Sequence, residues 1–480
     1  MRSHLFISVL PFVALLLLAV PPTAAGEAAS LPDSTAADRT SAAVTVYNVN
    51  LALVREVRSL RIDRGGVASL RFMDVPSSIN PRTVSLKSLT APGALSVLEQ
   101  NYEYDLISPE KLLEKYVGQE VEVVEQAQDL TTRVSKATLL SVNGGPVYRI
   151  GDRIVLNQTG RVTLPSVPAD LVARPTLVWT LRSDKPGTHE VEASYLTDGV
   201  NWSADYVVVV DADDRSSDLT GWVTVENRSG ATFRDATLKL VAGDVRRVTP
   251  SAPVAYEAMR SELKAAAGAP QFAEESFFEY HLYTLDRPTT IRENETKQIT
   301  LLEAPSVPLT KRLLLVGQPG WYRSRYGTIA KDEKVSVVLE FKNAREAGLG
   351  IPLPKGTIRV YKKDRSGAEQ FVGEDAIGHT PKDETVKLKV GDAFDVVADR
   401  TQTDYRSLSP RQSESAFEIA LRNRKDEDAV VTVREPVGGD WQVVQSSQTY
   451  KKLDAGTIEF VVTVPKGQEV KLTYRVRVTW

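Results

Sequence analysis

Apolar and polar residues alternate along much of the chain with a period of two, which is the periodicity of a half-buried β-strand. The clearest case is VKLTYRVRVTW, from Val470 to Trp480, where every second side chain is apolar and those between are polar. The stretch TIEFVVTV before it, residues 457–464, alternates in the same way. The Pro-Lys-Gly sequence at 465–467 is typical of a tight turn, so we expect these two stretches to pair as a hairpin.

The segment YLTDGVNWSADYVVVVD, residues 195–211, combines several aromatic and acidic side chains. Strand geometry separates the two kinds, because Trp202 and Tyr206 fall on one face and Asp205 on the other. We expect both aromatic residues to lie in a core, with the Asp-Gly pair at 198–199 forming the turn before the strand. The segment is therefore predicted to be the corner of a β-sheet and not a cluster of catalytic acids.

One short helix interrupts the strands. Ser108 is a suitable N-cap, Pro109 fits the first turn, and Gly118 marks the end of the helix. The helix has an apolar face formed by Leu112, Leu113 and Tyr116. Several short alternating segments follow it, so a small β-barrel-like unit is predicted over 108–165, by analogy of fold alone.

The chain has 480 residues, which is too long for one hydrophobic core. Its many strands and short Gly and Pro turns predict an all-β, multidomain protein with β-sandwich-like domains. One Ala-rich stretch lacks the alternation and is expected to be a flexible or partly helical insertion. The expected divisions are a signal peptide (1–26), a flexible lead-in (27–41), an N-terminal β region (42–107), the barrel-like unit (108–165), the first part of a β-sandwich (166–250), the insertion (251–276), the rest of that β-sandwich (277–400) and a C-terminal β-sandwich (401–480).

The N-terminus has the pattern of a secretory signal peptide. Arg2 supplies a positive charge, an apolar stretch runs from Leu5 to Val20, and small residues near Ala25 and Gly26 suit cleavage. The alternative is a retained membrane anchor, although the stretch is shorter than the ~20 residues of a spanning helix. An exported chain of this length without cysteine fits the bacterial periplasm or cell exterior, with no membrane insertion once the signal is removed.

The charge balance gives no general attraction to nucleic acid or to acidic membranes, because 59 Lys plus Arg meet 62 Asp plus Glu, a net charge of −3. We therefore expect no nucleic-acid partner. The sequence contains no H-E-x-x-H, no G-x-S-x-G, no P-loop and no dinucleotide-binding glycine pattern. These absences remove the recognisable zinc, hydrolase and nucleotide-binding motifs and favour a role without catalysis.

Two acidic loops are candidates for metal binding or acid–base chemistry. The loop GEDAIGHTPKDE at 373–384 contains five titratable side chains, Glu374, Asp375, His379, Asp383 and Glu384. The turn DADDRSSD contains four carboxylates that could bind calcium, Asp211, Asp213, Asp214 and Asp218, without the glycine and distal glutamate of an EF-hand. The alternative for both is a charged, solvated connection between strands. No cofactor is expected otherwise, calcium or another divalent metal being the one candidate.

The loop GQPGWYRSRYG at 317–327 is the candidate ligand-binding surface. Aromatic rings among arginines can stack on sugars or hold anions, and the residues concerned are Trp321, Tyr322, Arg323, Arg325 and Tyr326. The alternative is a strand with aromatic residues in a core and arginines in solvent.

The second half of the chain resembles the bacterial domain of unknown function family number 4139. Three motifs carry the resemblance, PLPKGTIRVY at 352–361, GEDAIGHTPKDE at 373–384 and VGDAFDV at 390–396. The resemblance covers about 185–480, and relatives include mucoidy-inhibitor-like proteins. It implies β-sandwich architecture and bacterial export, and it assigns no catalytic residue.

Three functions are consistent with these predictions. The first is an exported envelope protein that acts as a non-catalytic binding or structural module for a protein or glycan partner. The second is a secreted, metal-assisted hydrolase with its site in the loop at 373–384. The third is an outer-membrane β-barrel, because such barrels also end in a strand with a terminal aromatic residue.

Overall fold

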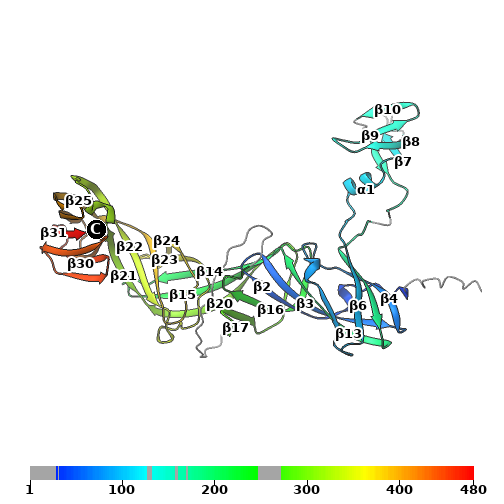
Figure 1. The fold of residues 1–480 in the computed structure, drawn as a ribbon, viewed down its shortest axis with the longest axis horizontal. Coiled ribbons are helices and arrows are strands. Elements are labelled where there is room, and N and C mark those ends of the chain that lie inside the picture. Colours follow the sequence, from blue (N-terminus) through cyan, green and yellow to red (C-terminus); the bar gives the residue numbers. More distant parts are fainter. Residues whose placement is uncertain (1–28, 31, 127–131, 157–159, 169–170, 247–271) are drawn as a thin grey trace, which may run out of the picture.

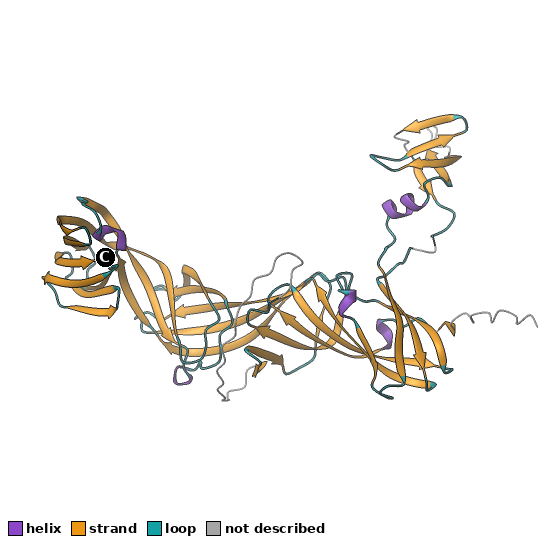
Figure 2. Cartoon of the chain, in the orientation of Figure 1, coloured by secondary structure: helices purple, strands orange, loops and turns teal. Residues whose placement is uncertain are grey.

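A computed structural model describes residues 29–30, 32–126, 132–156, 160–168, 171–246 and 272–480. These residues form thirty-one strands, one α-helix and four short 3-10 helices, η1 (Ala36–Asp38), η2 (Pro81–Thr83), η3 (Pro319–Tyr322) and η4 (Arg345–Ala347). The strands build a long body from which one small sheet projects (Figures 1 and 2). The predicted all-β, multidomain fold is confirmed.

The expected signal peptide and most of the expected insertion lie outside the described residues. Within the described part of the chain, no helix has both the length and the apolar character needed to cross a membrane.

One end of the body is a sandwich of two sheets. The smaller sheet has the order β1 (Ala29–Ser30), β4 (Gly66–Met73), β12 (Thr176–Ser183), β6 (Leu95–Glu103). The long sheet has the order β17 (Phe272–Phe277), β18 (Tyr280–Leu285), β16 (Phe233–Ala242), β2 (Arg39–Tyr47), β3 (Leu51–Ile62), β13 (Gly187–Asp198), β5 (Ser85–Ser88), and β19 (Thr289–Ile291) pairs with β16. Arg58 of β3 reaches across to Phe72 of β4, with 3.5 Å between the guanidinium carbon and the ring centroid.

The middle sheet continues the body. Its order is β20 (Glu295–Pro308), β15 (Ser216–Asn227), β14 (Val200–Val210), β23 (Gly356–Lys363), β24 (Glu369–Ile377). Trp202 and Tyr206 of β14 are buried as predicted, and Trp202 Nε1 donates a hydrogen bond to the Val241 carbonyl of the long sheet at 3.2 Å. The chain passes from the long sheet to the middle sheet at Gly199. This position requires glycine for two reasons: its φ is +81°, and a Cβ placed here would lie 2.8 Å from the Arg228 carbonyl oxygen.

The C-terminal sandwich is one nine-stranded sheet folded over a core, which we call the tip. Its order is β28 (Asp440–Ser446), β31 (Glu469–Thr479), β26 (Gln412–Asn423), β25 (Thr385–Ser409), β22 (Thr328–Lys342), β21 (Thr310–Val316), β27 (Ala429–Pro436), β30 (Thr457–Val464), β29 (Tyr450–Asp454).

The expected hairpin between β30 and β31 is wrong, because β30 pairs with β27 and β31 pairs with β26. The turn at 465–467 instead carries the chain from one layer of the tip to the other. Both strands do bury one face, through residues such as Phe460 and Tyr474, and these faces meet in the same core. Alternation therefore predicted the burial correctly but left the pairing partner open.

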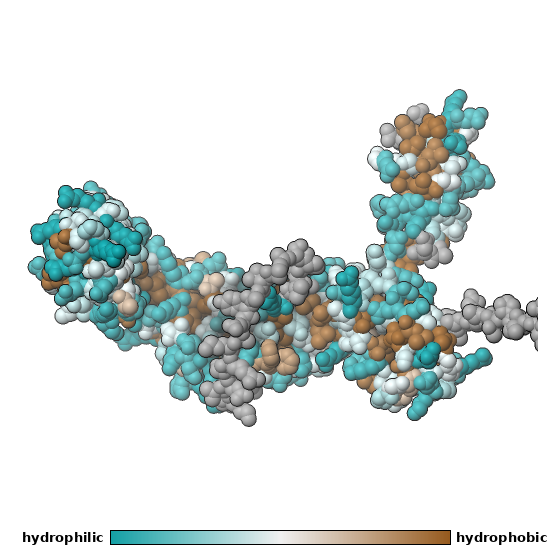
Figure 3. Space-filling model, in the orientation of Figure 1, coloured by the Kyte–Doolittle hydropathy of each residue, from teal (hydrophilic) through white to brown (hydrophobic). Residues whose placement is uncertain are grey.

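The projecting sheet, which we call the arm, covers most of the predicted barrel-like unit. Its helix α1 (Pro109–Lys115) starts at Ser108, whose hydroxyl accepts a hydrogen bond from the Lys111 backbone N–H at 3.2 Å. The strand order is β10 (Arg153–Leu156), β9 (Val147–Ile150), β8 (Thr132–Ser141), β7 (Glu120–Gln126), β11 (Arg161–Thr163). Apolar residues reach the surface of the arm (Figure 3), and the exposed ones include Val134, Ile154 and Leu156.

Two long strands connect the middle of the body to the tip. Leu339 and Phe341 of β22 belong to the large core of the body, whereas Val335 of the same strand belongs to the tip core. β25 behaves in the same way, with Leu388 in the first core and Val396 in the second. The two strands pair with each other from Lys342 and Thr385 to Thr328 and Thr401, with shifts of register at four places, so the tip is joined to the body by two paired strands.

Three buried asparagines, which we call the corner asparagines, lie where a strand ends. At Asn227 and Asn343 the chain passes to another sheet, and at Asn423 it passes from β26 to β27 within the sheet of the tip. Asn227 donates from its side-chain amide to the carbonyls of Ala231, Ile291 and Arg292, at 2.8, 3.3 and 3.1 Å. Asn343 and Asn423 make equivalent bonds at the ends of β22 and β26. In all three places the next strand joins an earlier strand in parallel, as β16 joins β2, β23 joins β14 and β27 joins β21.

Replacing a corner asparagine should therefore destabilise the fold. Asn227→Ala leaves three carbonyls without their donor, among them the buried carbonyl of Ile291, and we expect a loss of roughly 2–3 kcal/mol in the free energy of unfolding. Chemical denaturation followed by circular dichroism measures the loss. The exposed Asn101 on β6 is the matched control, and Asn101→Ala should change little. Equal effects of the two substitutions would contradict the assignment.

Candidate functional site

The structure separates the five titratable residues of the loop at 373–384. Glu374 and Asp375 lie on the edge strand β24. Glu374 Oε2 is 3.4 Å from Arg359 Nε, and Asp375 accepts hydrogen bonds from the backbone N–H groups of Ala376 and Lys389, both at 2.8 Å. The two neighbouring carboxylates therefore have different partners on β23 and β25.

His379 lies beyond the end of β24, beside the long sheet. Its Nδ1 accepts a hydrogen bond from the Lys355 backbone N–H at 3.2 Å, and its Nε2 lies 3.5 Å from Asn48 Nδ2. Burial lowers the pKa of His379 below its ordinary value, and the positive charge of Lys355 lowers it further. The ring is therefore neutral at pH 7.

Asp383 and Glu384 belong to the corner at Asn343. The Asp383 backbone N–H donates to the Asn343 carbonyl at 2.7 Å, and the Glu384 carbonyl accepts from the Asn343 N–H at 2.8 Å. Across the described ranges, no group of three or more His, Cys, Asp and Glu side chains is arranged to hold a metal ion.

The acidic turn between β14 and β15 uses its carboxylates within the fold. Asp211 accepts hydrogen bonds from the Arg215 and Ser216 backbone N–H groups at 2.9 and 3.1 Å, which closes the turn. Asp214 pairs with Lys311 at 2.5 Å and also with Lys362. The remaining two carboxylates point elsewhere: Asp218 accepts from the Ser306 N–H at 3.0 Å, and Asp213 is exposed.

The loop at 317–327 lies at the tip, where the short helix η3 places neighbouring side chains on opposite sides. Tyr322 is fully buried. Its hydroxyl donates to Glu435 Oε2 at 3.0 Å and lies 3.0 Å from the Tyr474 hydroxyl. Arg323, the next residue, is exposed and stacks on the Trp480 ring, with 4.2 Å from the guanidinium carbon to the ring centroid.

A buried ion pair lies directly beneath this loop. Arg400 and Glu435 have no exposed side-chain surface and form an ion pair, and Arg400 Nε also lies 3.1 Å from Glu333 Oε2. The Arg400 guanidinium carbon is 4.7 Å from the Trp321 ring centroid. Burial alone would lower the pKa of Arg400, but the charges of Glu435 and Glu333 raise it above its ordinary value, so Arg400 keeps its positive charge.

Side chains of β25 and β26 hold the backbone of the loop. The buried Gln402 accepts from the Tyr326 N–H at 2.6 Å and donates to the carbonyls of Trp321 and Ser324, at 3.1 and 3.0 Å. The Tyr405 hydroxyl donates to the Arg323 carbonyl at 2.9 Å. The loop therefore presents Arg323 and Trp321 in a fixed conformation.

A cleft of about 300 Å³ opens beside the stacked pair of Arg323 and Trp480, and its other lining residues are Tyr405, Ser407, Ser409, Pro410, Gln412 and Ser413. Of the five predicted residues, only Arg323 lines this cleft. Arg325 donates to the Tyr405 carbonyl at 3.4 Å, and Tyr326 is exposed outside the cleft.

Most of the cleft comes from the β25–β26 hairpin and from the end of β31, which the loop motif alone does not indicate. Trp480 is the last apolar residue of the alternating stretch at 470–480, and this alternation predicts a position facing the core. In the fold it lies half-buried at the rim of the core.

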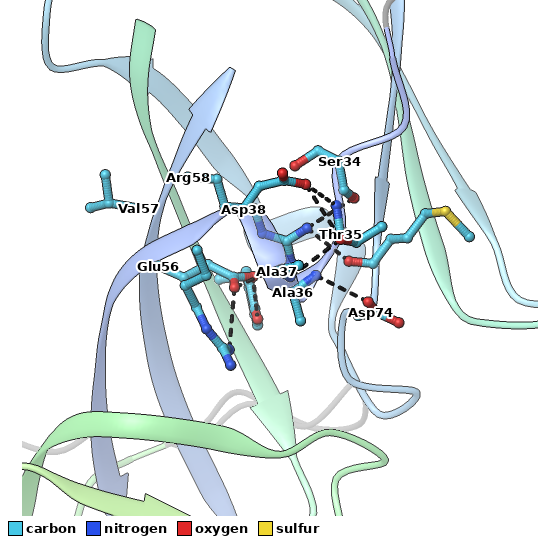
Figure 4. A network of polar contacts seen from close by, with 12 residues as sticks. Ser34, Thr35, Ala36, Ala37, Asp38, Glu56, Val57, Arg58 and Asp74 are labelled. Carbon is cyan, nitrogen blue, oxygen red and sulfur yellow. Dashed lines mark hydrogen bonds and ion pairs between the residues drawn. The ribbon is translucent and has the colours of Figure 1, made fainter. Parts of the chain in front are cut away.

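A second buried ion network lies at the opposite end of the body (Figure 4). Arg58 donates to both carboxylate oxygens of Glu56 at 3.2 Å and to the Ser34 and Met73 carbonyls at 3.0 and 2.9 Å. Tyr195 donates to the same Glu56 at 3.0 Å. This network fixes the segment before β2 against β4, and it is closed to ligands because its charged side chains are buried.

The ion pair beneath the tip loop should control the stability of the tip. Glu435→Gln leaves the Arg400 charge buried with only Glu333 as partner, and we expect a loss of roughly 3 kcal/mol in the free energy of unfolding. The double variant Arg400→Met, Glu435→Gln removes the uncompensated charge and should recover part of the loss. Thermal unfolding followed by near-ultraviolet circular dichroism compares the two, and a double variant no more stable than the single one would contradict this assignment.

Comparison with known proteins places most of this structure in one family. The sequence profile of the domain of unknown function DUF4139 matches residues 191–480. The matched range starts within β13 and includes the middle sheet and the whole tip. A search of curated proteins found no match. The chain belongs to the DUF4139 family.

Proposed function

We propose that the protein is an exported bacterial envelope module that holds a protein or glycan partner at its tip, without catalysis. The observation that carries this proposal is the stacking of Arg323 on Trp480 beside the cleft. Arginine and tryptophan are the residues most often found at the energetic centre of binding surfaces. Here both are accessible, and they lie at the end of a long body (Figure 1).

The rigidity of the loop supports a binding role. Binding is weaker when a flexible loop must become ordered, because the conformational entropy that the loop loses reduces the net binding free energy. Gln402 and Tyr405 already hold the loop backbone through four hydrogen bonds. The side chains that meet a partner are therefore organised before binding.

Export is part of the proposal. The apolar stretch from Leu5 to Val20, the small residues that follow it and the absence of cysteine support a location in the periplasm or outside the cell. A long body suits such a location, because it separates the tip from the opposite end, where the arm projects (Figure 2).

Crosslinked capture from native bacterial envelopes tests the proposal. The bait is the signal-processed protein, tagged after residue 480. The partner enriched by the native protein should be lost with Arg323→Ala and with Trp480→Ala, because each removes half of the stacked pair. Arg287→Ala is the matched control, since Arg287 is an exposed arginine outside the tip, and it should capture normally.

Thermal unfolding of each bait separates loss of binding from loss of folding. This matters for Trp480, which also packs against the tip core. Undiminished capture by a folded Arg323→Ala variant would remove the tip cleft from the proposal.

A further inference from the structure

We infer that the tip cleft binds an anionic saccharide. This inference rests on the proposed function, that the tip is the binding surface, and it names the chemistry of the ligand. Two features of the cleft lead to it, an uncompensated positive charge and a lining of neutral hydroxyl and amide groups.

The side chains that line the cleft include one cation, Arg323, and no acid, so their net charge is positive. Arg325 in the same loop and Arg411 in the turn between β25 and β26 add two further exposed cations nearby. Among the residues that the structure describes, none of these three arginines forms an ion pair with a carboxylate. Each guanidinium therefore keeps its full charge for an external anion.

The acids closest to the cleft along β25 and β26 are already neutralised. Glu414 lies 3.1 Å from Arg475 and 3.0 Å from Arg477. Asp404 lies 2.9 Å from Arg475 and 3.0 Å from Arg406. These pairs leave Arg323 as the charged side chain of the cleft lining without a carboxylate partner. An arginine can hold a carboxylate, phosphate or sulfate through two parallel hydrogen bonds.

The rest of the lining suits sugar hydroxyl groups, which both donate and accept hydrogen bonds. Ser407, Ser409 and Gln412 line the cleft with groups of the same dual character. The Tyr405 hydroxyl uses its proton on the Arg323 carbonyl and keeps its lone pairs as acceptors. Trp480 adds an aromatic surface of the kind on which sugar rings stack, although Arg323 covers one of its faces. An acidic peptide would gain from the charge but would leave many of these hydroxyl groups unpaired.

Binding of three polymers to the full chain tests the inference. Carboxymethyl dextran and dextran share one saccharide backbone and differ in the anion, whereas poly-L-glutamate carries the anion without the saccharide. We expect carboxymethyl dextran to bind most tightly and to weaken as salt is added. Arg323→Gln should weaken it by about tenfold, and Arg323→Lys should weaken it less, because a lysine keeps the charge but loses the paired hydrogen bonds. The exposed Arg287 again provides the control, as Arg287→Gln.

Four other outcomes would each contradict the assignment of an anionic saccharide. Equal binding of dextran would show a neutral saccharide site, and the proposed function would stand. Equal binding of poly-L-glutamate, with the same loss in Arg323→Gln, would show an acidic peptide site. Binding that Arg323→Gln leaves unchanged would place the ligand elsewhere. If no polymer binds while envelope capture still depends on Arg323, the saccharide assignment fails and the proposed function survives; loss of both refutes the two together.

Discussion

The architecture depends on two strands that belong to two cores at once. β22 and β25 pair from the register pair Lys342 and Thr385 in the body to the pair Thr328 and Thr401 in the tip, with four shifts of register between them. A ladder of backbone hydrogen bonds resists bending far more than a flexible linker does. A bend would break some of these bonds and leave backbone N–H and C=O groups without partners. The body and the tip are therefore expected to move as one unit.

The tip loop in turn depends on charge buried beneath it. Removing Arg400 and Glu435 from water is costly, and only their mutual attraction and the surrounding hydrogen bonds offset that cost. Glu435 also accepts from Tyr322, so the ion pair fixes the buried side of η3. With Tyr322 fixed inward, Arg323 must point outward. The network of Arg58 and Glu56 at the opposite end holds a chain segment in the same way but leaves nothing exposed for binding.

The sequence pattern correctly predicted features that depend on neighbouring residues alone, namely the buried faces of strands and the start of the helix. Period-two alternation gave the buried faces of β14, β30 and β31, and the cap at Ser108 gave the start of α1. Pairing between strands is decided by contacts far along the chain, so the turn at 465–467 resembled a hairpin and proved to be a crossing between layers. The cleft could not be predicted from the sequence for the same reason, because Gln402 and Tyr405 lie about eighty residues along the chain from the loop that they hold. The motif at 317–327 did not indicate which of its side chains face the core, and Tyr322 is the one that is fully buried.

The most direct test of this account is a distance measurement between the body and the tip. The chain has no cysteine, so spin labels can be placed uniquely by Glu303→Cys on β20 and Lys451→Cys on β29, both at exposed positions. The two strands shared by both cores predict one narrow distance distribution, as narrow as that of a control pair at Glu303 and Lys363 within the middle sheet. A broad or multimodal distribution for the body–tip pair alone would show a hinge between the two cores and would contradict the account.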